Sequence, residues 1–457
     1  MKKLITTIQN IWKIKELRNR LLFTFGLLFI YRMGSFVVLP GVNPAVLDSA
    51  NQNTGGATDL LGLINIFTGG AFSNASIFAL GIMPYITASI IIQLLGFAVP
   101  YFQRLQQKEG ESGRKKLNQI TRLLTVAITL VQGGGYLTYI NSQNAIDPSV
   151  PAGLFFIANT IVLSSGTVFA MWLGEKITDK GIGNGVSLLI TIGIIAGLPQ
   201  AIVFEFTAQL DNNGLILFVF ELAILFLIVM ATVLIVQGVR KIPIQFAKRM
   251  VGRGSSAMPA SGIRDYIPLK VNAAGVMPII FAQALMFLPA TVVQFVSGND
   301  GSIASSGLMQ QLLNPFSLTS TMMSFFLVVL FTYVYTALIV NPQQYSEYLK
   351  RQNAFIPGIK PGKPTADFID AVTSRITLPG SIFLGLIAIL PAFGVAFGVN
   401  QSLALFFGGT SLLILVAVVL DTLQQIESYL LMRKYDGLVK SGRIQGRSRV
   451  DGIGAGL

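Results

Sequence analysis

The sequence predicts an all-α polytopic membrane protein with ten transmembrane helices. Three observations support this. The composition is apolar, with a mean hydropathy of +0.66, 52% hydrophobic residues and only 12% charged residues. Ten apolar segments are long enough to cross a bilayer, which takes ~20 helical residues. All but one of the 33 Lys and Arg residues lie at the chain ends or on alternate connections and their borders. A soluble chain of 457 residues with two or three domains would have a different composition.

The ten segments are separated by polar, glycine-rich or charged stretches. Their expected limits are 21–40, 73–98, 120–140, 153–173, 185–204, 214–238, 272–295, 319–340, 377–397 and 402–424.

The distribution of basic residues predicts the topology. Every second connection lacks Lys and Arg: 41–72, 141–152, 205–213, 296–318 and 398–401. The positive-inside rule therefore places both termini and all basic connections in the cytoplasm. The basic N-terminus precedes an apolar run without an A-x-A-like cleavage site, so we expect it to be retained. The net charge of +13 then faces anionic lipid headgroups or an acidic partner.

Ten segments divide into two halves of five, and an odd number per half inverts the second half relative to the first. We expect an N-terminal half at 1–204, a hinge loop at 205–213 and a C-terminal half at 214–428. A basic cytoplasmic tail follows at 429–457. Inverted repeats of this kind place the working site between the halves, near the middle of the membrane.

One short apolar piece, Leu60–Phe67, does not fit the spanning pattern. Eight residues are too few to cross a bilayer as a helix. The piece is followed by Gly69 and Gly70 and then by the uncharged stretch 71–97. A half-length helix hinged onto a full span is typical of a re-entrant segment, which we expect at about 58–70. Such a segment requires a protein-lined cavity beside it.

Catalytic and cofactor chemistry have little support in the residues. The chain has no His and no Cys, so it lacks the commonest general base and the thiolate metal ligand. No phosphate-binding G-x-x-x-x-G-K-[ST] motif occurs, and GIGNG at 181–185 is more typical of a tight turn. We therefore expect no enzyme activity, no cofactor and no metal site.

Three other function classes remain alternatives. A secondary transporter needs a coupling carboxylate in mid-span, but Glu221, Glu175 and Asp421 lie near segment ends. Arg32 is expected to have a structural partner. A membrane-embedded enzyme is disfavoured by the missing His and Cys. An insertase without a through-pore is closer, and a plugging segment would distinguish a channel from it.

Six stretches resemble the SecY family, the channel subunits of the protein-conducting translocon, over essentially the whole chain. They are FTGGAFSNASIFALGIMPYITASIIIQLL (67–95), QKEGESGRKKLNQITR (107–122), MWLGEKITDKGIGNGVS (171–187), PLKVNAAGVMPIIFA (268–282), NAFIPGIKPGKPTADFID (353–370) and GGTSLLI (408–414). The resemblance implies an hourglass pore between the two halves. It also implies a lateral gate between the second and seventh spans and a partner subunit that clamps the back.

The resemblance also assigns residues to the pore. It places a constriction ring at Ile82, Ile86, Val186, Ile190, Ile280 and Ile414. It places a plug in the outer funnel with the apolar residues Leu60, Leu61, Leu63, Ile64, Ile66 and Phe67. The spacing agrees in part, because both ring pairs on single helices are four residues apart and share a face. Val186 is one methylene smaller than isoleucine. Packing or lipid contact is the alternative for any of these side chains.

The lateral gate is expected to involve Ser89, Gln93, Asn272 and Ile279. The amides of Gln93 and Asn272 lie on the two spans that would face each other. Interhelical hydrogen bonds of this kind are weak, on average ~0.6 kcal/mol, so a signal segment could replace them. The alternative is that each amide bonds within its own helix.

The basic connections 239–271 and 341–376 resemble docking arms, with Lys248, Arg249, Arg253 and Lys360 as contact residues. Arg253 is followed by glycine where the family commonly has a second arginine, and Lys360 replaces an arginine and loses its forked geometry. The implied partners are SecE-like and SecG-like subunits, a SecA-like motor ATPase, the ribosome, signal peptides with nascent chains, and the lipid bilayer. The implied location is the cytoplasmic (inner) membrane. A basic loop that only enforces topology is the alternative.

Overall fold

The structure is a computed structural model. It describes residues 12–44, 46–47, 60–107, 109–211, 214–246, 250–251, 258–259, 264–286, 311, 314, 316–407 and 409–440.

The described residues are mainly long apolar helices, as the sequence predicts. Seven helices are long and apolar enough to cross a membrane, and an eighth is obtained if one bent pair counts as a single span. The seven are α7 (Gly110–Ser142), α8 (Ala152–Lys180), α9 (Gly185–Asp211), α10 (Leu215–Gln237), α13 (Leu318–Ile339) continued by α14 (Pro342–Arg351), α15 (Lys363–Ala396) and α17 (Gly409–Lys440). The bent pair is α5 (Met83–Ala98) with α6 (Pro100–Gln107), which meet at 103°.

Each of the ten expected segments overlaps a described helix, although the helices of the first, second and seventh segments do not by themselves meet the criterion for a complete span. The first segment is α2 (Lys15–Gly34), which carries charged residues at both ends. The seventh contains the short apolar helix Met277–Met286; residues 272–276 before it form a turn, and residues 287–295 lie outside the described ones. The tenth is divided between α16 (Gln401–Phe407) and α17. The fold class is confirmed, whereas the count of ten complete spans is not reproduced one for one.

The second expected segment, 73–98, begins as irregular backbone and becomes helical only at Met83. Gly69, Gly70, Ala75 and Gly81 have positive φ angles, which a helix does not allow, and Pro84 starts the helix in its first turn. The irregular stretch is buried and bonded to the chain after α2: Leu39 N donates to Ala75 O at 2.8 Å and Ile77 N to Val37 O at 2.9 Å. Irregular backbone is tolerated at membrane depth when it is satisfied in this way.

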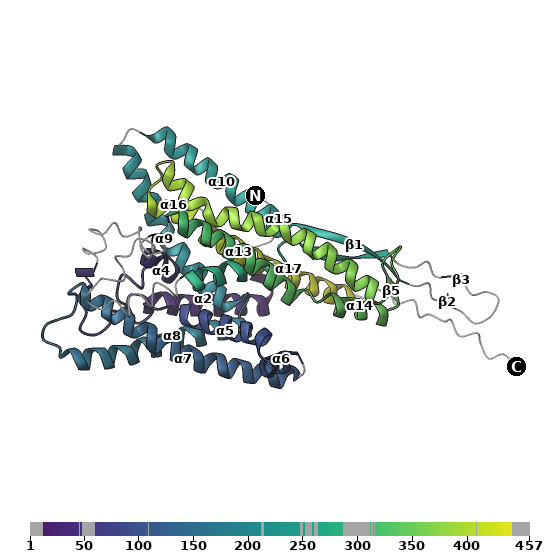
Figure 1. Ribbon diagram of the computed structural model, residues 1–457, viewed down its shortest axis with the longest axis horizontal. Helices are drawn as coiled ribbons and strands as arrows, with labels where there is room; N and C mark the ends of the chain where they lie inside the picture. The colour runs from purple at the N-terminus through teal and green to yellow at the C-terminus, as the bar shows by residue number, and fades with distance from the viewer. Residues whose placement is uncertain are drawn as a thin grey trace.

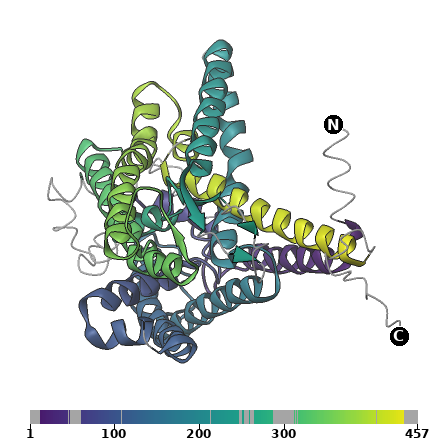
Figure 2. The same cartoon turned by 90° about the vertical axis from the view of Figure 1, so that its right-hand side faces the viewer.

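The molecule is elongated, and its two ends differ. In Figure 1 the early helices α5 to α8 lie below, and the later helices α10, α13, α15 and α17 lie above. The antiparallel strands β1 (Val239–Phe246) and β4 (Arg264–Lys270) extend at one end of the long axis, called the hairpin end here. The short helix α4 (Leu60–Thr68) lies toward the opposite end. Figure 2, a view onto the hairpin end, shows helices on all sides of a central region.

The largest buried cluster joins both halves of the chain. It contains side chains from α2, α5, α8 and α9 of the first half and from helix Met277–Met286, α13, α15 and α17 of the second. The expected hinge loop 205–213 is helical through Asp211, because α9 continues past Ala201. Glu205 and Gln209 on this last stretch of α9 are buried and hydrogen-bonded to each other at 2.9 Å, which holds the extra turns in place.

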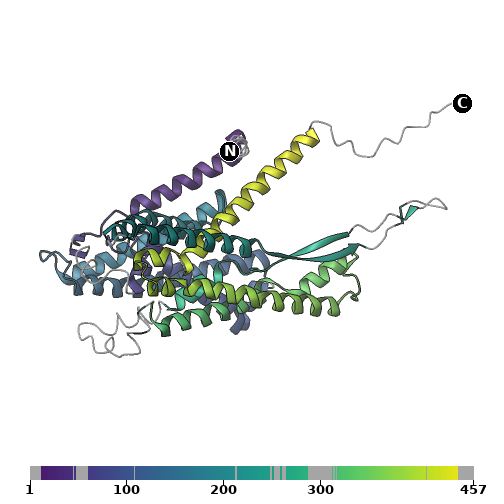
Figure 3. The same cartoon turned by 90° about the horizontal axis from the view of Figure 1, so that it is seen from above.

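The two expected docking arms form one folded unit at the hairpin end. Strand β1 pairs with β4 in the register Ile242↔Ile267 and also with β5 (Ala354–Phe355) from the second arm. A separate apolar cluster lies between them, built from Ile242, Ile244, Leu269, Leu349, Ala354, Ile356 and Ile369. Figure 3 shows this unit extending away from the apolar helices.

Candidate functional site

The six residues expected to form a constriction lie together in the central cluster. Five are isoleucines with 1% to 7% of their surface exposed: Ile82, Ile86, Ile190, Ile280 and Ile414. Val186 is partly buried and packs against the same cluster. They come from α5 and its N-cap, from α9, from helix Met277–Met286 and from α17. The structure thus brings together, from four helices and both halves, side chains that are far apart in the sequence.

Helix α4 lies against this cluster, and its limits differ by one residue from the expected short piece. Phe67 is buried in the cluster, and Ile64 and Ile66 pack against it. The expected plug residues Leu60, Leu61 and Leu63 belong to the helix, but their side chains lie outside the described ones. The described apolar residues of α4 therefore pack in the same cluster that contains or contacts the six candidate ring residues.

A very close backbone approach joins the end of α4 to α9. At Gly193 an added Cβ would overlap the carbonyl oxygen of Phe67 and lie 3.2 Å from the nitrogen of Gly69. Glycine is the residue that permits this contact, because any side chain would push α4 away. The position of the short helix thus depends on a glycine in the middle of α9.

Polar contacts fix the turn after α4. The guanidinium of Arg32 on α2 donates to the carbonyl oxygen of Gly69, and it lies 5.0 Å from the centre of the Phe36 ring. The side-chain oxygen of Asn65 accepts a hydrogen bond from Ser73 N at 3.0 Å. Arg32 therefore has the structural partner that the sequence led us to expect, and that partner is the base of the short helix.

The expected gate residues are placed on two neighbouring elements, but no described hydrogen bond joins the two amides. Gln93 donates to Ser89 at 3.1 Å within α5, which is the intrahelical alternative. Asn272 lies in the turn before helix Met277–Met286, and its side-chain oxygen is buried without a partner among the described residues. Ile279 is 1% exposed in the central cluster. The expectation that Gln93 and Asn272 bond across the gate is not met in this structure.

Two adjoining cavities lie between the gate elements and the neighbouring helices. The larger has a volume of about 350 Å³ and is lined by Ser89 of α5 and by Met277, Ile280 and Phe281 of the facing helix. The smaller has a volume of about 210 Å³ and is lined by Asn272, Asp421 and residues around them. Both include Asn184, Ser187 and Met277 in their linings, so they share a wall.

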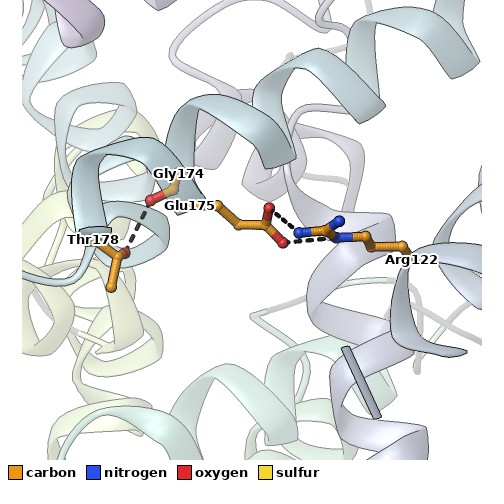
Figure 4. A network of polar contacts seen from close by, with 4 residues as sticks. All are labelled: Arg122, Gly174, Glu175 and Thr178. Carbon is orange, nitrogen blue, oxygen red and sulfur yellow. Dashed lines mark hydrogen bonds and ion pairs between the residues drawn. The ribbon is translucent and has the colours of Figure 1, made fainter. Parts of the chain in front are cut away.

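An ion pair on the wall of the larger cavity was not singled out by sequence reasoning. Arg122 of α7 donates to Glu175 of α8 through two nitrogens, at 2.6 and 3.1 Å, as Figure 4 shows. One turn further along α8, Thr178 donates to the carbonyl oxygen of Gly174 at 2.9 Å. The sequence placed Glu175 only as a helix-end residue. The sequence signal that could have pointed to this ion pair was the basic motif QKEGESGRKKLNQITR, which ends at Arg122.

The docking residues are only partly described. Lys248, Arg249 and Arg253 lie outside the described residues. Lys360 is exposed, and its carbonyl oxygen accepts a hydrogen bond from Thr365 at 2.9 Å. Its neighbour in the sequence, Ile359, packs against the apolar cluster that joins the two arms.

A family model named SecY matches residues 76–423, which is well over half of the chain. This chain belongs to the SecY family. The protein translocase subunit SecY of Chlamydia muridarum is 39% identical and covers 97% of this chain and 100% of its own length. The subunit of the same name from Streptomyces scabiei is 42% identical, with coverages of 96% and 100%. The resemblance drawn from the six sequence motifs is thereby confirmed.

Solved structures share the fold at low sequence identity. One is described as the structure of a protein conducting channel, with a TM-score of 0.63 at 18% identity over 92% of this chain and 94% of that one. A second concerns the plug domain of SecY in the closed channel, with a TM-score of 0.61 at 19% identity over 92% and 93%. A third is Sec61 in a canine ribosome-channel complex, with a TM-score of 0.58 at 16% identity over 92% and 94%.

Proposed function

We propose that this SecY-family chain is the channel-forming subunit of a protein translocase. It passes unfolded secretory polypeptides across the cytoplasmic membrane and releases transmembrane segments sideways into the lipid. One observation carries the proposal: five isoleucines from four helices belong to one buried cluster, Val186 packs against it, and a helix too short to span the membrane packs against the same cluster. That arrangement supports a closed pore that is blocked by a short plug helix.

The constriction seals the closed pore against ions. A narrow apolar ring dewets and blocks ions, whereas a passing polypeptide meets no polar group that would hold it. In this assignment the ring consists of Ile82, Ile86, Val186, Ile190, Ile280 and Ile414. Helix α4 is the plug, and it seals the neck from the side that faces away from the hairpin end. A polypeptide must displace α4 and widen the ring together.

The lateral gate lies between α5 and helix Met277–Met286. Support comes from the cavity of about 350 Å³ that both elements line, with Ser89 on one side and Met277 on the other. The amide of Gln93 bonds within its own helix, so no described amide pair holds this gate shut. An apolar signal segment gains ~0.8 kcal/mol for each buried CH₂, which is enough to separate a pair of helices held mainly by packing.

The energy for transport comes from partners. The folded arm unit at the hairpin end is the docking site for a motor ATPase or a ribosome, with Lys360 and the basic residues of the first arm as contacts. SecE-like and SecG-like subunits complete the complex. The location is the inner membrane, with both termini and the arms in the cytoplasm, because the basic residues gather on that side. Two five-helix halves, 1–204 and 214–428, move relative to each other about the connection 205–213, of which 205–211 form the end of α9.

An insertase without a through-pore is the alternative, and plug deletion separates the two. Residues 60–67 are removed, and ion conductance is recorded in planar bilayers that contain the complex. A plugged pore becomes leaky at rest, whereas an insertase without a pore stays silent. Removal of residues 441–457 from the basic tail is the control and leaves the resting conductance unchanged. A silent plug deletion in a complex that still exports preproteins would contradict the pore assignment.

A further inference from the structure

The larger gate cavity combines an apolar wall with a charged rim. The apolar side chains include Ile86, Ile280 and Phe281, and the charged ones are Arg122, Glu175 and Asp179. The cavity lies toward the hairpin end, because α7 begins there beside α6 and α8 runs back to end there. A segment that entered from this end would meet the charged rim first and the apolar wall next.

The ion pair on the rim is formed but accessible. Arg122 and Glu175 are joined by two hydrogen bonds, at 2.6 and 3.1 Å, yet their side chains are 51% and 25% exposed. Exposed ion pairs are weak, because water solvates both charges and salt screens them. Another cation that reaches the cavity can therefore take the place of Arg122 on Glu175 without leaving a buried charge unpaired.

The two adjoining cavities are locally acidic on the basic side of the molecule. Their linings carry three carboxylates, those of Glu175, Asp179 and Asp421, against the two cations Arg122 and Lys270. The whole chain has the opposite balance, with 33 basic and 20 acidic residues. Asp179 has no ion-pair partner among the described residues. A positively charged segment is thus attracted to the cavity, whereas an acidic one is not.

A second observation also points to an incoming group that donates hydrogen bonds. Asn272 lines the smaller cavity and is 7% exposed, and its side-chain oxygen accepts no hydrogen bond from any described residue. A buried acceptor without a donor is costly. A backbone N–H or an ammonium group of an entering chain would satisfy it. The two cavities share Met277, so one segment can reach both.

We propose that Glu175 binds the basic residue at the start of a signal segment and that Arg122 forms the ion pair with Glu175 while the channel is idle. The inference rests on the proposed function and adds a specificity-determining pair to it. A secretory signal begins with a basic stretch followed by 7 to 15 apolar residues. That order matches the cavity, whose carboxylates lie at the rim and whose branched apolar side chains lie behind them. On arrival a lysine or arginine of the signal displaces Arg122 from Glu175.

A purely structural tie between α7 and α8 is the competing account, and it predicts a different pattern. In that account Glu175→Gln and Arg122→Gln break the same ion pair and therefore shift any measured property in the same direction. In our proposal the two variants act in opposite directions on the preference for a basic signal. Glu175→Gln removes the carboxylate that binds the basic residue of the signal, whereas Arg122→Gln removes the arginine that competes with this residue for Glu175.

The test uses the complete translocase complex and two preproteins that differ only at the signal start, one with two lysines and one with none. The readout is the ratio of their export rates. We expect Glu175→Gln to lower the ratio by about twofold to fivefold, the range typical of a partly exposed charge pair. Arg122→Gln should raise it. Glu109→Gln is the matched control, because its pair with Lys116 at 3.3 Å lies outside the cavity linings, and it should leave the ratio unchanged.

A crosslink locates the contact directly, because the chain contains no cysteine of its own. A cysteine at Asn118, on the cavity wall, should form a disulfide with a cysteine at the start of a stalled basic signal. The yield should fall in Glu175→Gln. If both glutamine variants shift the ratio in the same direction, or leave it unchanged while export continues, this inference is overturned alone. Failure of the wild-type complex to export either preprotein would overturn the proposed function as well.

Discussion

The guanidinium of Arg32 donates a hydrogen bond to the backbone carbonyl oxygen of Gly69, so α2 holds the turn that ends α4. The same turn approaches α9 at Gly193. The short helix is therefore fixed by two contacts at its base, one polar and one of close packing. Removal of either contact should free α4 while the constriction behind it stays intact.

Loss of the Arg32 contact should make the idle channel leak. A hydrogen bond to a charged group contributes ~1.5–3 kcal/mol, so Arg32→Leu should raise the population with a displaced plug by about tenfold or more. Resting conductance in planar bilayers measures this. Arg32→Lys keeps the charge and a donor and should leak less. Arg20→Gln, which breaks the exposed pair with Glu16 on the same helix, is the control. A tight Arg32→Leu channel would contradict the anchoring role.

A side chain at Gly193 should displace the plug from the other direction. Gly193→Val places atoms where the carbonyl of Phe67 lies, so α4 must move outward and resting conductance should approach that of the plug deletion. Gly135→Ala on α7 is the matched control, because nothing lies within 4 Å of the added Cβ there. Equal conductance for the two variants would show that α4 does not depend on the approach to α9.

Polarity and volume in the constriction should change the leak in opposite directions. Ile190→Asn introduces a polar group into the apolar ring, favours wetting and should raise ion conductance several-fold once the plug is deleted. Ile190→Leu keeps the apolar volume and serves as the control. Val186→Ile adds one methylene and should lower the leak. Unchanged conductance in all three variants of the plug deletion would remove these residues from the ring.

A covalent bond across the gate should stop transport. Ser89 and Met277 line the same cavity from α5 and from helix Met277–Met286, so cysteines at both positions should crosslink. Preprotein export should then fall to background and return on reduction. A cysteine pair at Ser89 and Ile216, with the second residue 88% exposed on α10, is the control. Full export despite quantitative crosslinking would argue against a sideways exit at this point.

The cluster between the arms should be needed for partner binding but not for closure of the pore. Ile242 is 3% exposed in that cluster, and Ile242→Ala should destabilise the arm unit by ~2–5 kcal/mol. Binding of a motor ATPase or of ribosomes should weaken, while resting conductance stays at the wild-type level. Val239→Ala, at a position 41% exposed on the same strand, is the control. Wild-type affinity in the Ile242 variant would place the docking surface elsewhere.

Residues with strong local patterns were predictable. Apolar length and one-sided basic charge predicted the membrane helices, and the limits of α4 followed from eight apolar residues before two glycines. The sequence pattern did not predict the structure where contacts between distant segments determine the backbone conformation. Residues 73–82 were expected within a span, but they are irregular because Gly81 and Ala75 take positive φ angles and the chain near Leu39 satisfies their backbone. The β1–β4 hairpin in the first arm was likewise missed, since its two strands are separated by a long stretch of chain.

The sequence by itself determined the class of protein, the concentration of basic residues on alternate connections and the family, because each depends on residue type and on spacing along the chain. Only the tertiary structure decided which residues meet. Ile82, Ile86, Ile190, Ile280 and Ile414 share one buried cluster although they lie far apart in the sequence. Arg32 donates to Gly69, 37 residues away, and Gln93 bonds within its own helix instead of to Asn272. Such contacts depend on how helices pack in three dimensions, and packing between distant segments leaves little periodic trace in the chain.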